Sequence, residues 1–374
     1  MSFMKLQQIK QMLNEKFYDR DVEIEALLIA LLSKQHILFI GPAGTGKSAL
    51  SAMLGEIVED STYFQHLLTP FSTPEELFGV LSLKDLEQGI YRRNIKGMLP
   101  EANFAFIDEI FKANSAILNS LLTLINERIY YNNGVPIPTP LMSIVGSSNE
   151  YIEEGEGLEA LFDRFLLRYE VDYIRDDEKF IAMLQNNEEV QLPKLSMQEL
   201  IQHQHRVKHV QIPPKLFEVI AKIRRQLQDE GIRPSDRRFK QSLSIIQAKA
   251  YLEGRFEVQR SDLMILTHTL WETIEQKEQV KLTINSVAFD SVEEFISRIS
   301  PQFDGIVLNA QNIMLGHHHP AKKTELSKLL MEGKSLFLEV QAMNRQVPDR
   351  KELALLKDQM QRKLLQITTE VIGF

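Results

Sequence analysis

The chain has 374 residues, 44% hydrophobic and 25% charged, a composition typical of a globular protein large enough for two or three domains. It contains no cysteine, which excludes disulfides, thiolate zinc sites and a cysteine nucleophile, and its net charge of −8 argues against broad binding to nucleic acid or membrane surfaces. No apolar run approaches the roughly 20 residues that span a bilayer, and the first residues lack the apolar block of a signal peptide. We therefore expect a soluble, cytoplasmic protein.

The first motif is HILFIGPAGTGKSAL, at residues 36–50. It fits the pattern G-x-x-x-x-G-K-[ST], with a strand-like ILFI before it and a helix-compatible SALSAMLGEIV after it. The glycines let successive backbone N–H groups point at phosphate oxygens, Lys47 adds a positive charge, and Ser48 can bind Mg²⁺. The residues predicted to contact a nucleotide are Gly41, Pro42, Ala43, Gly44, Thr45, Gly46, Lys47, Ser48 and Ala49.

A second apolar strand, NFAFIDEI at 103–110, ends in two carboxylates. Asp108 can hold a hydrated Mg²⁺ beside Ser48, and Glu109 can polarise a water for attack on the γ-phosphate. Acids in this position also cap helices, and the helix NSAILNSLLTLINER follows. After a phosphate loop the pair favours hydrolysis over binding alone.

A third strand, LMSIVGSSNE, ends in Asn149, which could orient the same water or contact the γ-phosphate. Arg164 follows in the apolar stretch LEALFDRFLLRYEV. A charged side chain in such a stretch indicates a binding role, and we predict that Arg164 contacts a phosphate held by a neighbouring subunit. Arg168 in the same stretch is the competing candidate. Further on, RPSDRRFKQSL places Arg237 at a helix start, from which a guanidinium could reach phosphate from a second domain.

Together these segments, with FSTPEELFG and GRFEVQRSDL, resemble MoxR-type AAA+ ATPases, most closely the RavA branch, over about residues 15–275. The resemblance implies an AAA+ P-loop core, an all-helical lid, ATP and Mg²⁺ as cofactors, a hexameric ring and, commonly, a protein client with a von Willebrand factor A domain. The implied roles are Walker A (41–48), Walker B (Asp108, Glu109), sensor 1 (Asn149), trans arginine finger (Arg164) and sensor 2 (Arg237).

Residues 1–175 alternate strand and helix signals, which predicts an α/β core with a parallel sheet flanked by helices. Strand signals end there, and residues 176–275 carry helical spacing that predicts a small lid. Residues 276–374 form a C-terminal region, in which two amphipathic segments predict an antiparallel helical arm.

Two inserts in the core are expected to project from it as hairpins. Residues 79–101 alternate apolar and polar residues around Gly89, and residues 128–145 carry NNG between strand-like halves. The resemblance implies that they are a helix-2 insert and a pre-sensor-1 hairpin facing the ring's channel.

The charge of these inserts bears on nucleic acid as a substrate. The segment IYYNNGVPIPTPL has no charged residue, so it lacks the cations that hold phosphates. Arg92, Arg93 and Lys96 in the other insert are the best support for a nucleic-acid motor, partly offset by Asp85 and Glu87.

Histidines also occur in patterns that invite a metal interpretation, HHHP at 317–320 and the pair His205 and His209. The first lies in a predicted loop beside PAKK, and the second lacks the glutamate of H-E-x-x-H, so we interpret both as solvated histidines.

The leading hypothesis is a Mg²⁺-dependent ATPase, assembled as a ring, that remodels or matures a protein partner. A slow nucleotide-gated binding module is the first alternative. A motor that translocates nucleic acid is the second and less favoured one.

Overall fold

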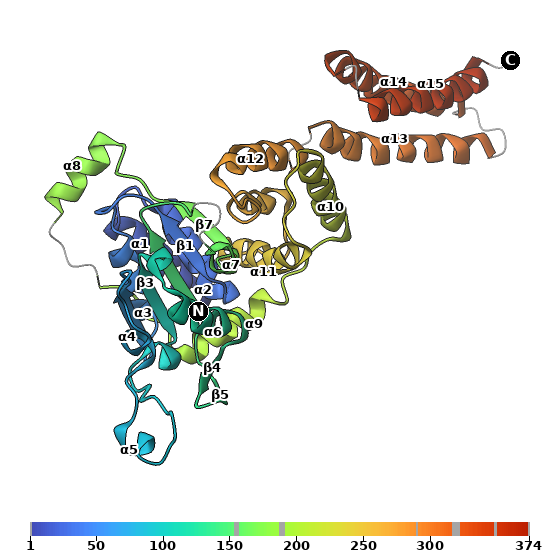
Figure 1. Cartoon of the computed structure of the whole chain (residues 1–374). Coiled ribbons are helices and arrows are strands. Elements are labelled where there is room, and N and C mark those ends of the chain that lie inside the picture. Colours follow the sequence, from blue (N-terminus) through green and yellow to red (C-terminus); the bar gives the residue numbers. More distant parts are fainter. Residues whose placement is uncertain are drawn as a thin grey trace. The chain divides into compact units, whose positions relative to one another are not determined.

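The structure of the protein is a computed structural model that describes residues 2–152, 157–186, 191–288, 291–315, 322–347 and 350–372. The chain divides into two compact units, Met1–Ala288 and Phe289–Phe374. The first unit holds the sheet and all the motifs predicted to bind nucleotide, and the described part of the second is helical (Figure 1). The histidine run at 317–319 lies outside the described residues.

A five-stranded parallel sheet forms the centre of the first unit, with the strand order β2-β3-β6-β1-β7. Its strands are β1 (Ile37–Ile40), β2 (Tyr63–Leu67), β3 (Phe104–Asp108), β6 (Ser143–Ser148) and β7 (Leu167–Glu170). Strands β1 and β6 are buried along their whole length, as apolar strands covered on both faces require. Because β3, β6 and β1 are neighbours, the carboxyl ends that carry the three predicted motifs meet at one edge.

Helices and short 3₁₀ turns surround this sheet. They are α1 (Ser2–Lys16), α2 (Asp21–Ser33), α3 (Lys47–Ile57), α4 (Pro74–Phe78), η1 (Leu99–Glu101), η2 (Ile110–Lys112), α6 (Ser115–Glu127) and α7 (Glu159–Arg164). Helix α2 contacts β1 and β7, and α3 contacts β2 and β3. The apolar run ALLIALL lies in α2 and is buried all round, as expected of a helix packed inside a protein. Among the described residues, no helix has the length and apolar character needed to cross a bilayer. The predicted α/β class is confirmed.

Helices follow the sheet, over the region predicted to be the lid and a little beyond it. They are α8 (Asp177–Gln185), α9 (Met197–Val207), α10 (Pro214–Asp229), α11 (Asp236–Leu252), η3 (Arg260–His268) and α12 (Ile274–Ala288). Ser196 and Ser235 cap α9 and α11, and Pro214 stands in the first turn of α10, as their positions before apolar-periodic runs indicate. Buried apolar residues of α9 to α12 belong to the same core as the sheet. The first unit therefore continues through α12 to Ala288.

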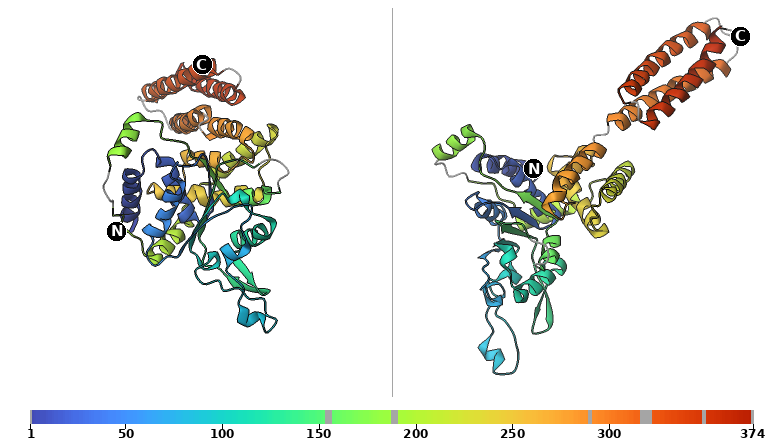
Figure 2. Two further views of the ribbon diagram at one scale, coloured as in Figure 1. Left: turned by 60° about the vertical axis from the view of Figure 1, so that its left-hand side comes forward. Right: turned by 45° about the horizontal axis from the view of Figure 1, so that its top comes forward.

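The two inserts differ in structure. Strands β4 (Ile129–Asn132) and β5 (Val135–Pro138) pair antiparallel, and Asn133 and Gly134 make the turn with positive φ at both positions. Residues 79–101 instead hold a short helix, α5 (Leu83–Leu86), and a single antiparallel bridge between Leu81 and Arg93. Ser82 accepts the Asp85 N–H and starts that helix, so the alternating pattern does not continue as a strand. Both inserts project from the sheet (Figure 2).

The second unit contains α13 (Ser291–Leu315), α14 (Lys322–Gln346) and α15 (Lys351–Ile372), which lie side by side in both views of Figure 2. Their inward residues form a separate core that includes Ile299, Phe303, Val340 and Met360. Two of these helices are the predicted arm, and α13 packs against both of them.

Candidate active site

The phosphate loop joins the end of β1 to the start of α3. Gly41, Gly44 and Gly46 have φ of +155°, +81° and +85°, values that favour glycine. At Gly41 a Cβ would also stand 1.9 Å from the Val171 carbonyl oxygen, so no side chain fits there. The loop thus leads into the N-terminus of α3, where unpaired backbone N–H groups and the helix dipole favour an anion.

Lys47 lies in the first turn of α3, and its side chain folds back over the loop. Its Nζ donates to the carbonyls of Gly41 at 2.6 Å and Pro42 at 2.8 Å, and it lies 3.3 Å from Asn149 Oδ1. Burial lowers the pKa of Lys47, and the nearby carboxylates of Asp108 and Glu109 oppose that shift. Ser48 follows with its side chain exposed, next to the loop that Lys47 covers.

The predicted carboxylates lie beside this lysine. Asp108 ends β3 and accepts hydrogen bonds from the Ser147 hydroxyl and, at 3.1 Å, from the Glu109 N–H. Glu109 takes the left-handed conformation, with φ +50° and ψ +46°, which is uncommon outside glycine. Asn149 Nδ2 donates to Glu109 Oε1 at 2.5 Å. Asn149 therefore joins the lysine of the loop to the carboxylate that is predicted to act on water.

A hydroxyl and a carboxylate are the donors that Mg²⁺ prefers, so Ser48 and Asp108 fit the predicted metal. Among the residues that the structure describes, no three His, Cys, Asp or Glu side chains cluster into a further metal site. His205 and His209 pack ring against ring at a centroid distance of 4.6 Å.

Two residues of this site were not predicted. Ser147 is fully buried and holds Asp108 from the neighbouring strand. Arg20, also buried, donates to the Thr45 carbonyl at 3.2 Å and to the Asp172 carbonyl at 2.6 Å, and so ties the loop to the end of β7. Ser147 could have been found from the sequence, because it is a polar residue inside an apolar run. Arg20 could not, because it stands before its helix in no recognisable motif.

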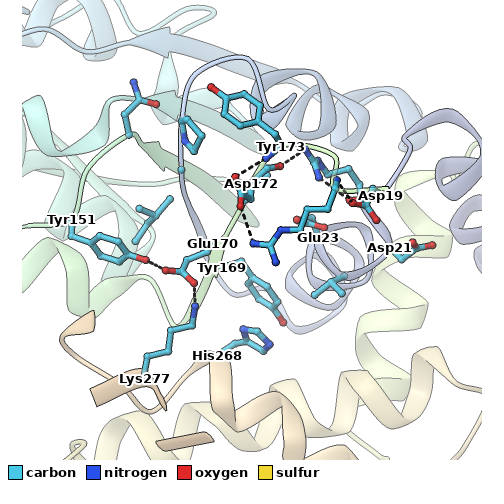
Figure 3. A pocket seen from close by; sticks show the side chains of 18 residues that line it. Asp19, Asp21, Glu23, Tyr151, Tyr169, Glu170, Asp172, Tyr173, His268 and Lys277 are labelled. Carbon is cyan, nitrogen blue, oxygen red and sulfur yellow. Dashed lines mark hydrogen bonds and ion pairs between the residues drawn. The ribbon is translucent and has the colours of Figure 1, made fainter. Parts of the chain in front are cut away.

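A cavity of about 590 Å³ opens beside the loop, lined by Gly41, Pro42 and Asn149 together with residues of α2, β7 and the lid (Figure 3). On the lid side, Lys277 pairs with Glu170, which also accepts from the Tyr151 hydroxyl. His268 stacks on Tyr169 with ring centroids 4.0 Å apart. The cavity therefore lies between core and lid, where the resemblance places the nucleotide.

Arg164 and Arg237 lie elsewhere. They line a second cavity of about 170 Å³ together with Lys34 and His36, the residues that precede β1. The phosphate loop follows β1, so this cavity is at the opposite end of that strand. Arg237 donates to Asn126 Oδ1 at 3.0 Å, because α11 begins next to α6 and not next to the loop. The lid of a chain does not bring Arg237 to the phosphate loop of that chain.

Arg168, the competing candidate, is fully buried. Its guanidinium donates to the carbonyls of Phe162, Phe165 and Trp271 and lies 3.8 Å above the Phe162 ring. Burial and the neighbouring Arg238 lower the pKa of Arg168. All of these contacts are internal, so Arg168 supports the core and Arg164 is the candidate that a neighbouring molecule could meet.

The arginines of the helix-2 insert are also engaged within the chain. Arg93 pairs with Glu75 at 2.8 Å, and Arg92 lies 4.0 Å from Asp85. These acids reduce the positive charge that the insert presents for a nucleic acid.

Comparison with known proteins adds the family. A model of the MoxR domain in the MoxR-vWA-beta-propeller ternary systems matches residues 4–211, more than half of the chain. The chain belongs to the MoxR family of AAA+ ATPases. A model of the AAA lid domain matches residues 215–284, which include most of α10, all of α11 and η3, and most of α12.

Individual relatives agree with this assignment. The chain is 39% identical over 311 residues to an uncharacterized protein of Methanocaldococcus jannaschii, covering 82% of the chain and 80% of that relative. It is 30% identical over 169 residues to the chaperone MoxR1 of Mycobacterium tuberculosis, covering 43% of the chain and 42% of that relative. A solved structure from Cytophaga hutchinsonii, of a protein proposed to be an ATPase, matches with a TM-score of 0.63 and 19% identity over 76% of the chain and 94% of its own. These matches confirm the predicted AAA+ fold.

Proposed function

We propose that the protein is a Mg²⁺-dependent ATPase whose subunits complete one another's active sites. One observation carries this proposal. The phosphate loop, both carboxylates and Asn149 meet at the carboxyl end of the sheet, whereas Arg164 and Arg237 lie together at the other end of β1. Two arginines that face away from the loop of their own chain suit the phosphate of a neighbouring one.

In this proposal the side chains have separate tasks. Backbone N–H groups of Gly41 and of residues 43–49, together with the Lys47 ammonium, bind the phosphates, and Pro42 contributes no N–H. Ser48 and Asp108 would hold Mg²⁺, which would neutralise charge that develops on the phosphate oxygens. Glu109 accepts a proton from, and orients, the attacking water. Asn149 sets the position of Glu109 through the 2.5 Å hydrogen bond between them.

The process that ATP hydrolysis drives is proposed from the relatives. A family defined by MoxR-vWA-beta-propeller systems, and a relative called a chaperone, support remodelling or maturation of a protein client, with a von Willebrand factor A domain as the candidate class. A hexameric ring, membership of the RavA branch and a cytoplasmic location are parts of the same proposal. The uncharged tip of the β4–β5 hairpin and the paired arginines of the other insert favour a protein client over a nucleic acid.

The first experiment uses Glu109→Gln, which should bind ATP and Mg²⁺ but hydrolyse poorly. The tagged variant is recovered from its native host with ATP present, and bound macromolecules are identified. A co-purifying protein that is lost when Lys47→Ala removes nucleotide binding supports remodelling. Nuclease-sensitive nucleic acid supports the motor instead, and a ring without a client supports the slow switch.

The trans arrangement is tested by mixing inactive variants. Lys47→Ala keeps Arg164 but cannot bind nucleotide, and Arg164→Ala binds nucleotide but lacks the finger. Because a finger contributes roughly 10³ to 10⁵ in rate in other systems, each variant alone should be nearly inactive. The mixture should regain turnover, since one subunit supplies the arginine and the other the nucleotide. A mixture as inactive as its components would contradict the trans arrangement.

A further inference from the structure

Asp163, the residue before the proposed finger, lies between two arginines. Its Oδ2 accepts from Arg164 Nη1 at 3.1 Å, and its Oδ1 accepts from Arg238 Nη1 at 2.9 Å. Arg164 and Asp163 end helix α7 of the core, whereas Arg238 lies in the first turn of lid helix α11. One carboxylate therefore links the finger to the lid.

The two arginines differ in their surroundings. Arg238 is only 2% exposed, and its guanidinium also donates to the backbone carbonyls of Thr269, Asp163, Phe165 and Leu166. With its donors engaged on both sides, this side chain is fixed by the core. The Asp163 side chain is 39% exposed, and an ion pair between two side chains as exposed as this one contributes little stabilising free energy. The buried Arg238 is thus what holds the carboxylate in place.

Two arginines in the first turn of helix α11 point in different directions. Ser235 caps it by accepting the Arg238 N–H at 3.2 Å. From this turn Arg238 enters the protein toward Asp163, while the preceding Arg237 reaches the cavity that it shares with Arg164. The pair between the buried Arg238 and the partly exposed Asp163 therefore sets the spacing of Arg164 and Arg237.

We propose that Arg238 is a positioning residue, which acts through Asp163 to hold Arg164 and Arg237 at one fixed separation for the nucleotide of the neighbouring subunit. This inference rests on the proposed function. A side chain displaced by about 1 Å from a productive geometry can lose roughly 10²-fold in rate. Arg238→Met, which keeps the length of the side chain but not its donors, should therefore lower kcat by about 10²-fold and leave the ATP dissociation constant within about threefold.

A purely structural role is separated from positioning by the same mixing assay. Mixed with Lys47→Ala subunits, which have an intact finger, Arg238→Met subunits should regain turnover to the level of the Arg164→Ala mixture. Mixed with Arg164→Ala subunits they should remain inactive, since neither partner then supplies a correctly held finger. Failure of the first mixture, when the Arg164→Ala mixture succeeds, would mean that the substitution damages its own nucleotide site and would overturn the proposal. If the Arg164→Ala mixture itself fails, the trans arrangement has failed first.

Two further variants complete the test. Arg224→Met is the control. It removes the ion pair, 3.1 Å long, between Arg224 of α10 and Asp236 in the first turn of α11, leaves Asp163 untouched and should not change turnover. If Arg238→Met does not fold, Asp163→Asn takes its place, because it keeps the Arg238 bonds to backbone carbonyls and removes only the shared carboxylate. Asp163→Asn should behave in both mixtures as described for Arg238→Met. Turnover of either variant within threefold of the unmodified protein would refute the positioning role.

Discussion

Replacing Arg168 by methionine should destabilise the first unit strongly, whereas the same change at Arg164 should not. Arg168→Met removes three hydrogen bonds, to the carbonyls of Phe162, Phe165 and Trp271. The first two carbonyls keep a second donor, the Phe165 N–H and Arg238 respectively, whereas the Trp271 carbonyl loses its donor. Each hydrogen bond from a charged group contributes about 1.5–3 kcal/mol, and relief of the buried charge offsets part of the loss. Three bonds at the lower value come to about 4.5 kcal/mol, and after that offset we expect a net loss of about 3 kcal/mol.

Arg164 gives the matched comparison. Its recorded partner is the neighbouring Asp163, at 3.1 Å and partly exposed, and such pairs contribute about 0–1 kcal/mol. Arg164→Met should therefore keep its stability and lose turnover. Arg168→Met should lose stability, and at temperatures where it is folded its turnover should fall far less.

The chain has a single tryptophan, Trp271, which is fully buried in the first unit and accepts one of the Arg168 hydrogen bonds. Its fluorescence during urea unfolding reports on this unit alone, so the second unit does not complicate the transition. An unchanged unfolding midpoint for Arg168→Met would refute the structural role given to this arginine. A larger shift for Arg164→Met would reverse the assignment of the two residues.

Three shorter predictions follow. Gly41→Ala should abolish binding of a fluorescent ATP analogue, because its Cβ would stand 1.9 Å from the Val171 carbonyl oxygen, whereas Gly44→Ala, with open space around it, should lose less than about tenfold; equal losses would contradict this. Burial lowers the pKa of His268 to about 4, below its value of 6.5 in the unfolded chain, so unfolding takes up a proton as pH falls and about 2 kcal/mol of stability should be lost by pH 5. His268→Phe should remove that part of the loss in urea titrations at pH 7 and 5, and an unchanged loss would exclude this histidine as its source. Asn132→Ala should speed limited proteolysis of both inserts, because the buried Asn132 amide accepts the Arg93 N–H and donates to the Arg93 carbonyl, and so joins the β4–β5 hairpin to the insert at 79–101. An unchanged cleavage rate would show that the inserts do not depend on this contact.

Local pattern was sufficient to locate the phosphate loop, Asp108, Glu109 and Asn149. Each follows an apolar strand, and in a parallel sheet the carboxyl ends of neighbouring strands meet at one edge. Once three such strands are recognised, their terminal residues are near one another whatever the rest of the chain does. The NNG turn is equally local, because both of its central residues must adopt positive φ.

Other residues depended on contacts between distant segments. Ser147 and Arg20 matter because strand order and the end of β7 bring them to Asp108 and the loop. Within the run LEALFDRFLLRYEV, only packing decides that Arg168 faces inward and Arg164 faces the second cavity.

The sequence by itself thus determined three strands of the sheet, the phosphate loop and the helical region after the sheet, since each depends on residues close together in the chain. It did not locate β2 and β7, and it wrongly predicted a hairpin at 79–101. Only the tertiary structure decided where the arginines lie. The sequence already places Arg237 at the start of a helix. The side of the core on which α11 packs decides whether this arginine lies near the phosphate loop of its own chain or away from it. That choice comes from the buried contacts between lid and core, among them the pair of Arg238 with Asp163, and these contacts join residues far apart in the sequence.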